Sequence, residues 1–264
     1  MDIGPAPSSA TSSKLVIGAS CPFPAMPPPV AIGLTVLPAH PCSYLPDRMA
    51  QSRAFLCDAI DGHIYHEFMD AGFRRSGKLI YQPICAGCRK CLPIRVPVAQ
   101  FAASKSQRRC VRRNQDLTLS LGKPCPADER FELYWRYVNE WHQGDTDKRQ
   151  AFEDFLYDSP AQTIEFSYRD PQGKLVAAGI CDVCACSLSS VYFYFDPDEA
   201  WRGLGTYGAI QEIAFAQRAR IAYYYLGYWV DGCGAMEYKS SFRPFELLYP
   251  DGIWREKGGD GWGP

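Results

Sequence analysis

The chain of 264 residues lacks the features of membrane-spanning and secreted proteins. No apolar run approaches the roughly 20 residues that cross a bilayer, and Asp2 with the early prolines argues against a secretory signal peptide. The net charge is only −1, so the whole-molecule field offers no steering toward phosphate. Histidine is also scarce, with four in the chain. We therefore expect a cytoplasmic protein with no membrane partner and no histidine-based catalytic triad.

Cysteine, in contrast, is abundant, with 12 residues. In a reducing compartment, clustered thiols are more often metal ligands than disulfides. Cys85, Cys88 and Cys91 form a double Cys-x2-Cys spacing, which lets a short loop surround one metal centre. Cys42 is the candidate fourth ligand, and four thiolates suit zinc or an iron–sulfur cluster. The alternative is that these are loop cysteines without a ligand.

Composition divides the chain into four parts. A hydrophobic fraction of 47% is enough for one large core or two small ones. Residues 1–30 are rich in Pro and Ser, and we predict a disordered extension there. Residues 31–125 form the predicted cysteine-rich domain, residues 126–256 the predicted catalytic domain, and residues 257–264 a glycine-rich tail.

Local patterns predict an α+β fold. Three antiparallel strands, a helix and a further strand near the C-terminus give a mixed sheet with flanking helices. The strands are expected at residues 32–37, 79–81, 94–98, 163–168, 175–183, 189–195 and 222–229. The helices are expected at residues 47–59, 61–77, 104–114, 131–142, 152–157 and 207–218.

The strongest local pattern for chemistry runs from Ser190 to Lys239. It contains an aromatic strand, then Asp196, then the turn Gly203-Leu204-Gly205-Thr206, a helix and a second aromatic strand. The first N–H groups of a helix have no partner within it, so this layout can hold a phosphate, a carboxylate or a developing oxyanion. It is the layout of an acyl-transfer site. An ordinary tight turn is the alternative.

A basic run occupies residues 104–114. Its cations recur at intervals of three and four residues, so a helix would gather most of them on one side, where they can follow a phosphate backbone. The candidate phosphate-binding residues are Lys105, Arg108, Arg109, Arg112 and Arg113. A solvated helix face is the alternative.

Several strings resemble the bacterial aspartate/glutamate leucyltransferases, relatives of the arginyl-tRNA–protein transferases. They are Pro41-Cys42-Ser43-Tyr44-Leu45-Pro46, Ser104-Lys105-Ser106, Tyr225-Leu226-Gly227-Tyr228-Trp229, Cys233-Gly234-Ala235-Met236-Glu237-Tyr238-Lys239 and Phe242-Arg243-Pro244. The resemblance implies an N-terminal cysteine-rich, metal-binding half followed by an N-acetyltransferase-like mixed sheet. It also implies transfer of leucine from Leu-tRNA to proteins that begin with Asp or Glu, which marks them for degradation. For the cations of the basic run at residues 104–114, it implies a role in tRNA binding. Arginine-transferring relatives carry a second cysteine where this chain has Leu45, which leaves the metal open.

Those substrates suggest roles for particular residues. An aminoacyl ester is already activated, so the enzyme must mainly align it with an amine and stabilise the oxyanion. Asp196 is the candidate for orienting the amine or accepting its proton, with a capping carboxylate as the alternative. The N–H groups around Gly203, Gly205 and Thr206 are the candidates for holding the ester carbonyl or the terminal ribose phosphate.

An acidic acceptor also needs a fixed cation. A guanidinium can pair with a carboxylate through two hydrogen bonds, so Arg243 is favoured over Lys239, with Arg75 as a third option. The other candidate substrate-binding residues are Tyr194, Tyr207 and Tyr228, although most aromatic residues in such strands belong to the core.

Three other functions compete with leucyl transfer. The donor could be Arg-tRNA, since an arginine pocket needs a carboxylate and a leucine pocket should be apolar. The chain could be a non-enzymatic, metal-containing tRNA-binding protein. An acetyl-CoA acetyltransferase is weaker, because no phosphate loop of full length is seen and the basic run would have no purpose.

Overall fold

The computed structural model describes residues 13–15, 31–144 and 148–257. Most of the predicted N-terminal extension and nearly all of the glycine-rich tail lie outside the described residues. Ser13–Leu15 differs from the expected disorder, because it forms β1 and pairs antiparallel with β2 (Ile32–Val36). An edge strand offers unpaired N–H and C=O groups, and an extended segment can satisfy them.

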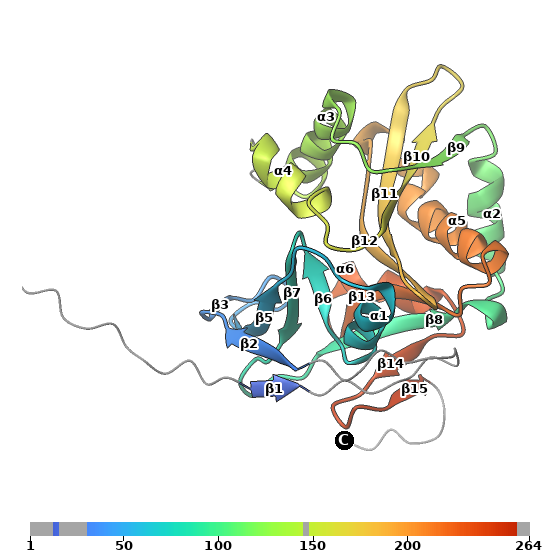
Figure 1. The fold of residues 1–264 in the computed structure, drawn as a ribbon. Helices are drawn as coiled ribbons and strands as arrows, with labels where there is room; N and C mark the ends of the chain where they lie inside the picture. The colour runs from blue at the N-terminus through green and yellow to red at the C-terminus, as the bar shows by residue number, and fades with distance from the viewer. Residues whose placement is uncertain (1–12, 16–30, 145–147, 258–264) are drawn as a thin grey trace, which may run out of the picture.

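The larger of the sheets has eight strands in the order β15-β14-β8-β13-β12-β11-β10-β9 (Figure 1). All neighbours are antiparallel except β12 and β13, which run parallel, so the predicted mixed sheet is confirmed. Its strands are β8 (Cys91–Pro97), β9 (Thr118–Gly122), β10 (Thr163–Arg169), β11 (Leu175–Val183), β12 (Ser187–Phe195), β13 (Tyr223–Val230), β14 (Glu246–Leu248) and β15 (Trp254–Glu256).

Helices cover both faces of this sheet. On one face, α5 (Leu204–Arg218) packs mainly on β12, its Phe215 and Tyr207 also contact rings of β10, and α2 (Lys105–Arg113) lies beside it (Figure 1). On the other face lie α3 (Asp128–Arg136) and α4 (Arg149–Leu156), which bury Leu133 and Phe152. Short helical turns complete the chain: η1 (Val98–Gln100), η2 (Tyr137–Trp141), η3 (Pro197–Arg202), α6 (Gly234–Glu237) and η4 (Tyr238–Ser241).

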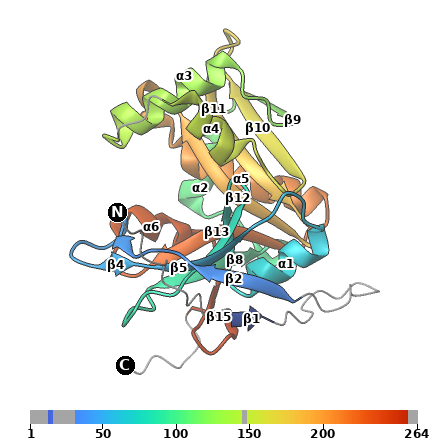
Figure 2. The ribbon, with the colours of Figure 1, turned by 60° about the vertical axis from the view of Figure 1, so that its left-hand side comes forward.

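The N-terminal part builds a five-stranded sheet in the order β1-β2-β5-β7-β6. It contains β5 (Ser52–Leu56), β6 (Arg74–Ser76) and β7 (Leu79–Pro83), while β3 (His40–Pro41) and β4 (Met49–Ala50) form a separate hairpin (Figure 2). The helix α1 (Gly62–Asp70) buries Phe68 and Met69, and their core cluster includes Tyr225 of β13. The two sheets therefore share a packed interface.

Two helix predictions in this part need correction. The helix predicted over residues 47–59 is wrong, since β4 and β5 occupy that stretch. Asp47 has a left-handed φ of 58°, and Ala54 is buried where β5 pairs with β7, so long-range pairing overrides the local helix preference. The helix expected over residues 61–77 was predicted to break at Gly72, and that break is confirmed by a φ of 87°, but no helix resumes after it, because β6 follows.

The predicted boundary between domains does not divide the sheets. The strand β8 belongs to the predicted cysteine-rich domain, yet it lies between β13 and β14 in the larger sheet. Searched over its described residues, the structure has no helix that is both long enough and apolar enough to cross a membrane.

Candidate functional site

The site begins where the parallel strands β12 and β13 separate. They pair only over Ser187–Ser189 and Tyr223–Tyr225, although each strand continues well beyond. Beyond Ser190 and Leu226 two adjoining cavities open, of about 420 and about 400 Å³. Both are bounded by α6 and η4. We call them the cation cavity and the corner cavity.

The cation cavity holds two buried cations, Arg74 of β6 and Lys239 of η4. Arg74 is 6% exposed, and neither its Nε nor its Nη2 finds a hydrogen-bond partner. Its Nη1 donates to Ser189 Oγ at 3.3 Å. Lys239 is 9% exposed and donates to the Tyr228 carbonyl at 2.8 Å. Burial, followed by the neighbouring charge of Arg74, lowers the pKa of Lys239 to about 7.

No acidic residue lines the cation cavity within the described part of the chain. The free ends of the two cations meet at Gly227, in the irregular part of β13, where φ is 83°. A Cβ at that position would lie 3.5 Å from Lys239 Nζ and 3.9 Å from Arg74 Nη2. Glycine therefore leaves open the space in front of two uncompensated cations, where an anionic group would fit.

The neighbouring Arg75 has a different environment. Although it also lines the cation cavity, its Nε and Nη2 donate to Asp182 at 2.5 and 2.8 Å, and both side chains are fully buried. Its charge is therefore compensated within the protein. Sequence reasoning selected Arg75 and missed Arg74, since the Arg-Arg pair gives no signal of which residue finds Asp182.

The corner cavity lies at the predicted glycine corner. Gly203, Gly205 and Thr206 line it, with a φ of 69° at Gly203 before α5 begins at Leu204. Most of the wall is apolar, including Phe193 and Phe195 of β12. The corner is open rather than filled by packed side chains, so the predicted acyl-transfer layout has room for a substrate.

The basic helix α2 packs directly against this corner. Its exposed face carries Lys105, Arg108, Arg109, Arg112 and Arg113. On its buried face, Cys110 Sγ donates to the Gly203 carbonyl at 3.4 Å, and Asn114 Nδ2 donates to the Arg202 carbonyl at 3.0 Å. None of the five cations forms an ion pair with a residue of the described chain. The predicted helix is thus confirmed. Its position beside the glycine corner could not be predicted from the sequence.

A shared wall joins the two cavities. It consists of Tyr137, His142, Ser190, Phe193, Leu226, Ala235 and Tyr238. Glu212 of α5 also lines the corner cavity, and it is 1% exposed. Sequence reasoning missed both Glu212 and His142, because Glu212 lies within an apolar helix and His142 follows an aromatic one, far from the glycine turn.

Asp196 lies outside the residues that line the two cavities. It caps η3 by accepting from the Asp198 N–H at 3.1 Å, and it forms ion pairs with Arg136 and Lys174 at 2.6 Å each. Burial would raise the pKa of Asp196, but the bonds from Lys174, the Asp198 N–H and Arg136 outweigh burial and lower it. This is the geometry of the capping alternative. A catalytic role for Asp196 stays a prediction.

Four other predicted substrate contacts occupy different places. Tyr228 lines the cation cavity, and its hydroxyl donates to the Gly72 carbonyl at 2.9 Å. Tyr194 and Tyr207 are buried in two separate core clusters, away from the cavity walls. Arg243 is exposed, with its guanidinium 5.9 Å from the centre of the Phe245 ring. The structure therefore brings only Tyr228, Lys239 and Arg75 together.

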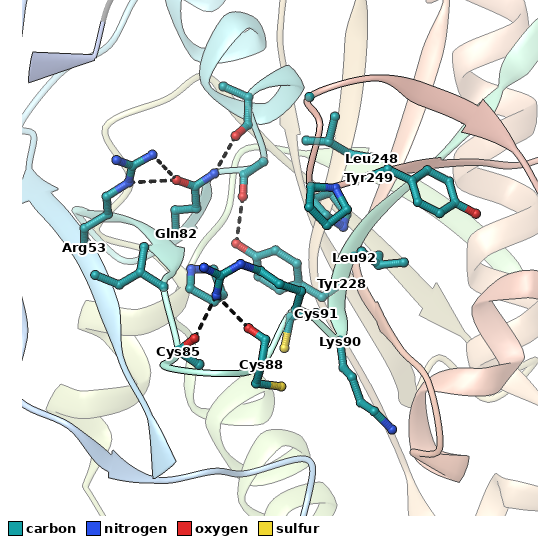
Figure 3. Close-up of a pocket in the computed structure, with 18 residues that line it drawn as sticks. Arg53, Gln82, Cys85, Cys88, Lys90, Cys91, Leu92, Tyr228, Leu248 and Tyr249 are labelled. Carbon is teal, nitrogen blue, oxygen red and sulfur yellow. Dashed lines mark hydrogen bonds between the residues drawn. The ribbon is translucent and has the colours of Figure 1, made fainter. Parts of the chain in front are cut away.

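The cysteine loop lines a third cavity, of about 360 Å³, which shares Tyr228 with the cation cavity (Figure 3). Arg89 donates to the carbonyls of Cys85 and Cys88, and Cys85 Sγ is within 3.4 Å of the Gln51 N–H. Burial, followed by Cys85, Cys42, Cys88 and Cys233, raises the pKa of Cys91 to about 12. The fifth thiol, Cys233, was not among the predicted ligands.

These thiols gather around Cys91 without forming a ligand set. Across the described residues, no three His, Cys, Asp or Glu side chains are arranged so that they could hold a metal ion. The predicted set of Cys42, Cys85, Cys88 and Cys91 is therefore not arranged as a metal site in this structure. Zinc or an iron–sulfur cluster stays a prediction.

Comparisons with known proteins agree on one family. The family model described as "Arginine-tRNA-protein transferase, N terminus" matches residues 40–109, and the model for the C terminus matches residues 129–249. An aspartate/glutamate leucyltransferase of Saccharophagus degradans is 39% identical over 214 residues, which cover 79% of this chain and 90% of that relative. One from Stenotrophomonas maltophilia is 41% identical over 228 residues, covering 82% and 90%.

Solved structures are more distant. L-PGS from Bacillus licheniformis is 12% identical with a TM-score of 0.43, covering 66% of this chain and 52% of that one. FemX is 9% identical with a TM-score of 0.46, covering 70% and 67%. Likenesses at this level support no further step.

Proposed function

Because this chain belongs to the arginine-tRNA-protein transferase family, together with the aspartate/glutamate leucyltransferases that it matches over most of their length, we propose that it transfers leucine from Leu-tRNA to the α-amine of proteins beginning with Asp or Glu. The product is a protein with an added N-terminal leucine, a mark for degradation. The observation that carries the acceptor assignment is the pair of uncompensated cations, Arg74 and Lys239, in a cavity that no acid of the described residues lines.

The acceptor's acidic side chain binds in the cation cavity. Buried charges cost several kcal/mol each unless they are paired, and Arg74 has two free nitrogens for a carboxylate. A guanidinium fork can hold a carboxylate through two hydrogen bonds. The incoming charge would also oppose the effect of Arg74 on Lys239 and favour its protonated form. An uncharged N-terminal residue would leave both cations buried and unpaired.

The donor reaches the corner cavity along α2. Cations on the exposed face of α2 contact tRNA phosphates without reading the base sequence, while the aminoacylated end enters beside Gly203. The aliphatic and aromatic lining suits a leucine side chain. Since Glu212 also lines this cavity, arginyl transfer is the second candidate, and the experiment must include both donors.

The experiment is a mass measurement. Purified protein is incubated with charged Leu-tRNA or Arg-tRNA and with peptides that begin with Asp, Glu, Asn, Gln or Ala and are otherwise identical. We expect the mass of one leucine residue to be added to the Asp and Glu peptides only. Addition of arginine in place of leucine would move the chain to the second candidate, and no mass gain with any pair would remove the transferase proposal.

A bound metal is tested separately. Elemental analysis of protein purified without oxygen distinguishes zinc, iron and neither. If the thiols rearrange into a ligand set, Cys88→Ser should lower the metal content, and a matched Cys125→Ser variant, at an exposed thiol, should not. Full metal in the Cys88→Ser protein would count against the predicted ligands.

A further inference from the structure

Glu212 is a buried carboxylate that the fold leaves half satisfied. Its Oε2 accepts from the Tyr224 hydroxyl at 2.5 Å, while its Oε1 is buried without a hydrogen-bond partner. A buried carboxylate oxygen without a hydrogen-bond partner is costly. Gly179 of β11 makes the room, since a Cβ there would lie 2.6 Å from Glu212 Oε1.

The position of Glu212 relates it to the reaction. It is the only Asp or Glu among the described residues that line the two cavities, and it interacts electrostatically with Ser190 and Tyr238 of their shared wall. His142 is the only histidine of these linings, but its side chain is exposed and its ring packs on Tyr137 with centroids 4.7 Å apart. Glu212 is therefore a buried carboxylate in the lining of the cavity that would hold the ester.

The surroundings give this carboxyl group a useful pKa. Burial raises the pKa of Glu212 to about 7, although the Tyr224 hydroxyl that donates to it and the nearby Cys181 thiol and Ser190 hydroxyl act in the opposite direction. The titratable groups that face it are Tyr168, Cys181, Tyr224 and Tyr238. No described lysine or arginine contributes to its shift, so its ionisation is set by burial and hydroxyl donors. An acceptor amine with a pKa near ~8 is thus matched by a base within about one unit.

We propose that Glu212 is the catalytic base that takes a proton from the acceptor's α-ammonium group, an inference that rests on the proposed leucyl transfer. The ammonium gives one proton to the Glu212 carboxylate, and its nitrogen then attacks the ester carbonyl carbon of Leu-tRNA. The new C–N bond forms as the C–O bond to the terminal ribose breaks. The ribose oxygen takes the proton from Glu212, and the second proton of the nitrogen leaves to solvent. The products are an amide, a free ribose hydroxyl and one proton.

The test is the single-turnover rate of Glu212→Gln with preformed Leu-tRNA complex between pH 6 and pH 9. We expect a loss of about 100-fold or more at pH 7. The deficit should narrow toward pH 9, where the peptide amine is already neutral. The difference in rate between Glu212→Gln and the wild type should also narrow with a peptide whose N-terminal amine is replaced by an aminooxy group. The nitrogen of that group is neutral before attack. Glu132→Gln, at an exposed glutamate of α3 outside both cavities, is the matched control, with a rate near that of the wild type.

Three results would overturn the inference: a Glu212→Gln rate equal to wild type, a loss of the same factor at every pH, or a loss of the same factor with both nucleophiles. Thermal melting and tRNA binding establish that the variant is folded. If Glu212→Gln does not fold, Tyr224→Phe is tested instead. Removing the Tyr224 donor raises the pKa of Glu212, so the transfer rate should begin to rise at a higher pH than in the wild type. An unmoved profile would overturn the inference. Failure of the wild-type protein itself to transfer leucine would instead remove the proposed function.

Discussion

The cation cavity and the corner cavity adjoin, but they are built for opposite partners. The first carries Arg74 and Lys239 and no acid among the described residues, whereas the second is mostly apolar and carries one acid, Glu212. The wall between them is shared, so an acidic N-terminal residue bound in one cavity would place its amine next to an ester held in the other. Under the proposed function, this contrast selects the acceptor by charge and the donor by shape within one opening of a sheet.

Arg75→Met should give the largest effect, and it should affect stability. Removing one partner of the buried pair with Asp182 leaves an uncompensated charge, which costs about 3–5 kcal/mol. Urea unfolding measures the loss. The double variant Arg75→Met with Asp182→Asn should recover much of it, and an additive double loss would contradict the pairing.

Arg74→Gln should weaken binding of the acceptor peptide, with no large effect on stability. Loss of a buried partner for a charged ligand costs about 2–5 kcal/mol, so the kcat/KM for Asp and Glu peptides should fall by roughly 30-fold or more. The preference for Asp over Asn peptides should shrink with it, while Leu-tRNA binding stays unchanged. Arg243→Gln, at an exposed arginine, is the matched control. Equal losses in the two variants would contradict the assignment to Arg74.

Asp196→Asn separates a capping role from a catalytic one. As a cap with two ion pairs, Asp196 should stabilise the fold by about 1–2 kcal/mol. Because the folded pKa of Asp196 is lowered, this stability is present above its unfolded pKa of about 4 and is lost as pH falls through the folded value. Unfolding at pH 7 and pH 3 measures the effect. A large loss of transfer rate without a loss of stability would instead support the catalytic prediction.

Substitutions in the basic helix α2 should give the smallest effect of the four, a weaker binding of tRNA. The triple variant Lys105→Ala, Arg109→Ala and Arg112→Ala removes exposed cations of α2 and should weaken tRNA binding at low salt. The slope of log affinity against log salt should become shallower by roughly one for each phosphate that is no longer neutralised. Filter binding across salt concentrations measures it. A matched triple variant at Lys123, Arg218 and Arg220 controls for net charge, and an equal change there would contradict a specific path along α2.

Local patterns predicted several elements well. The strand β11 runs from Leu175 to Val183 as expected, and the basic helix and glycine corner form where their residues indicated. These features depend on nearby residues: alternation for a strand, a Ser104–Gln107 capping box for the helix, and a left-handed φ at Gly203. The wrong helix over residues 47–59 marks the limit, because its strands are held by partners far along the chain.

The candidate site was predicted only in part for the same reason. Lys239 and Tyr228 were selected because they belong to strings that resemble the transferase family. Arg74 and Glu212, which come from β6 and the inner face of α5, lie outside those strings. Nothing near Arg243 in the sequence shows that its side chain faces solvent. The chemistry of a charged residue depends on its burial and on its partner, and neither can be predicted from residue spacing.

By itself, the sequence determined the family, the reaction class and the elements that hold the glycine corner, since motifs and periodicity are properties of consecutive residues. Only the tertiary structure decided which of two adjacent arginines stays free, because Asp182 lies more than 100 residues away from Arg75. It also placed Glu212 at the wall shared by the two cavities. Burial and the convergence of distant strands set those charges, and they exist only once the chain has folded.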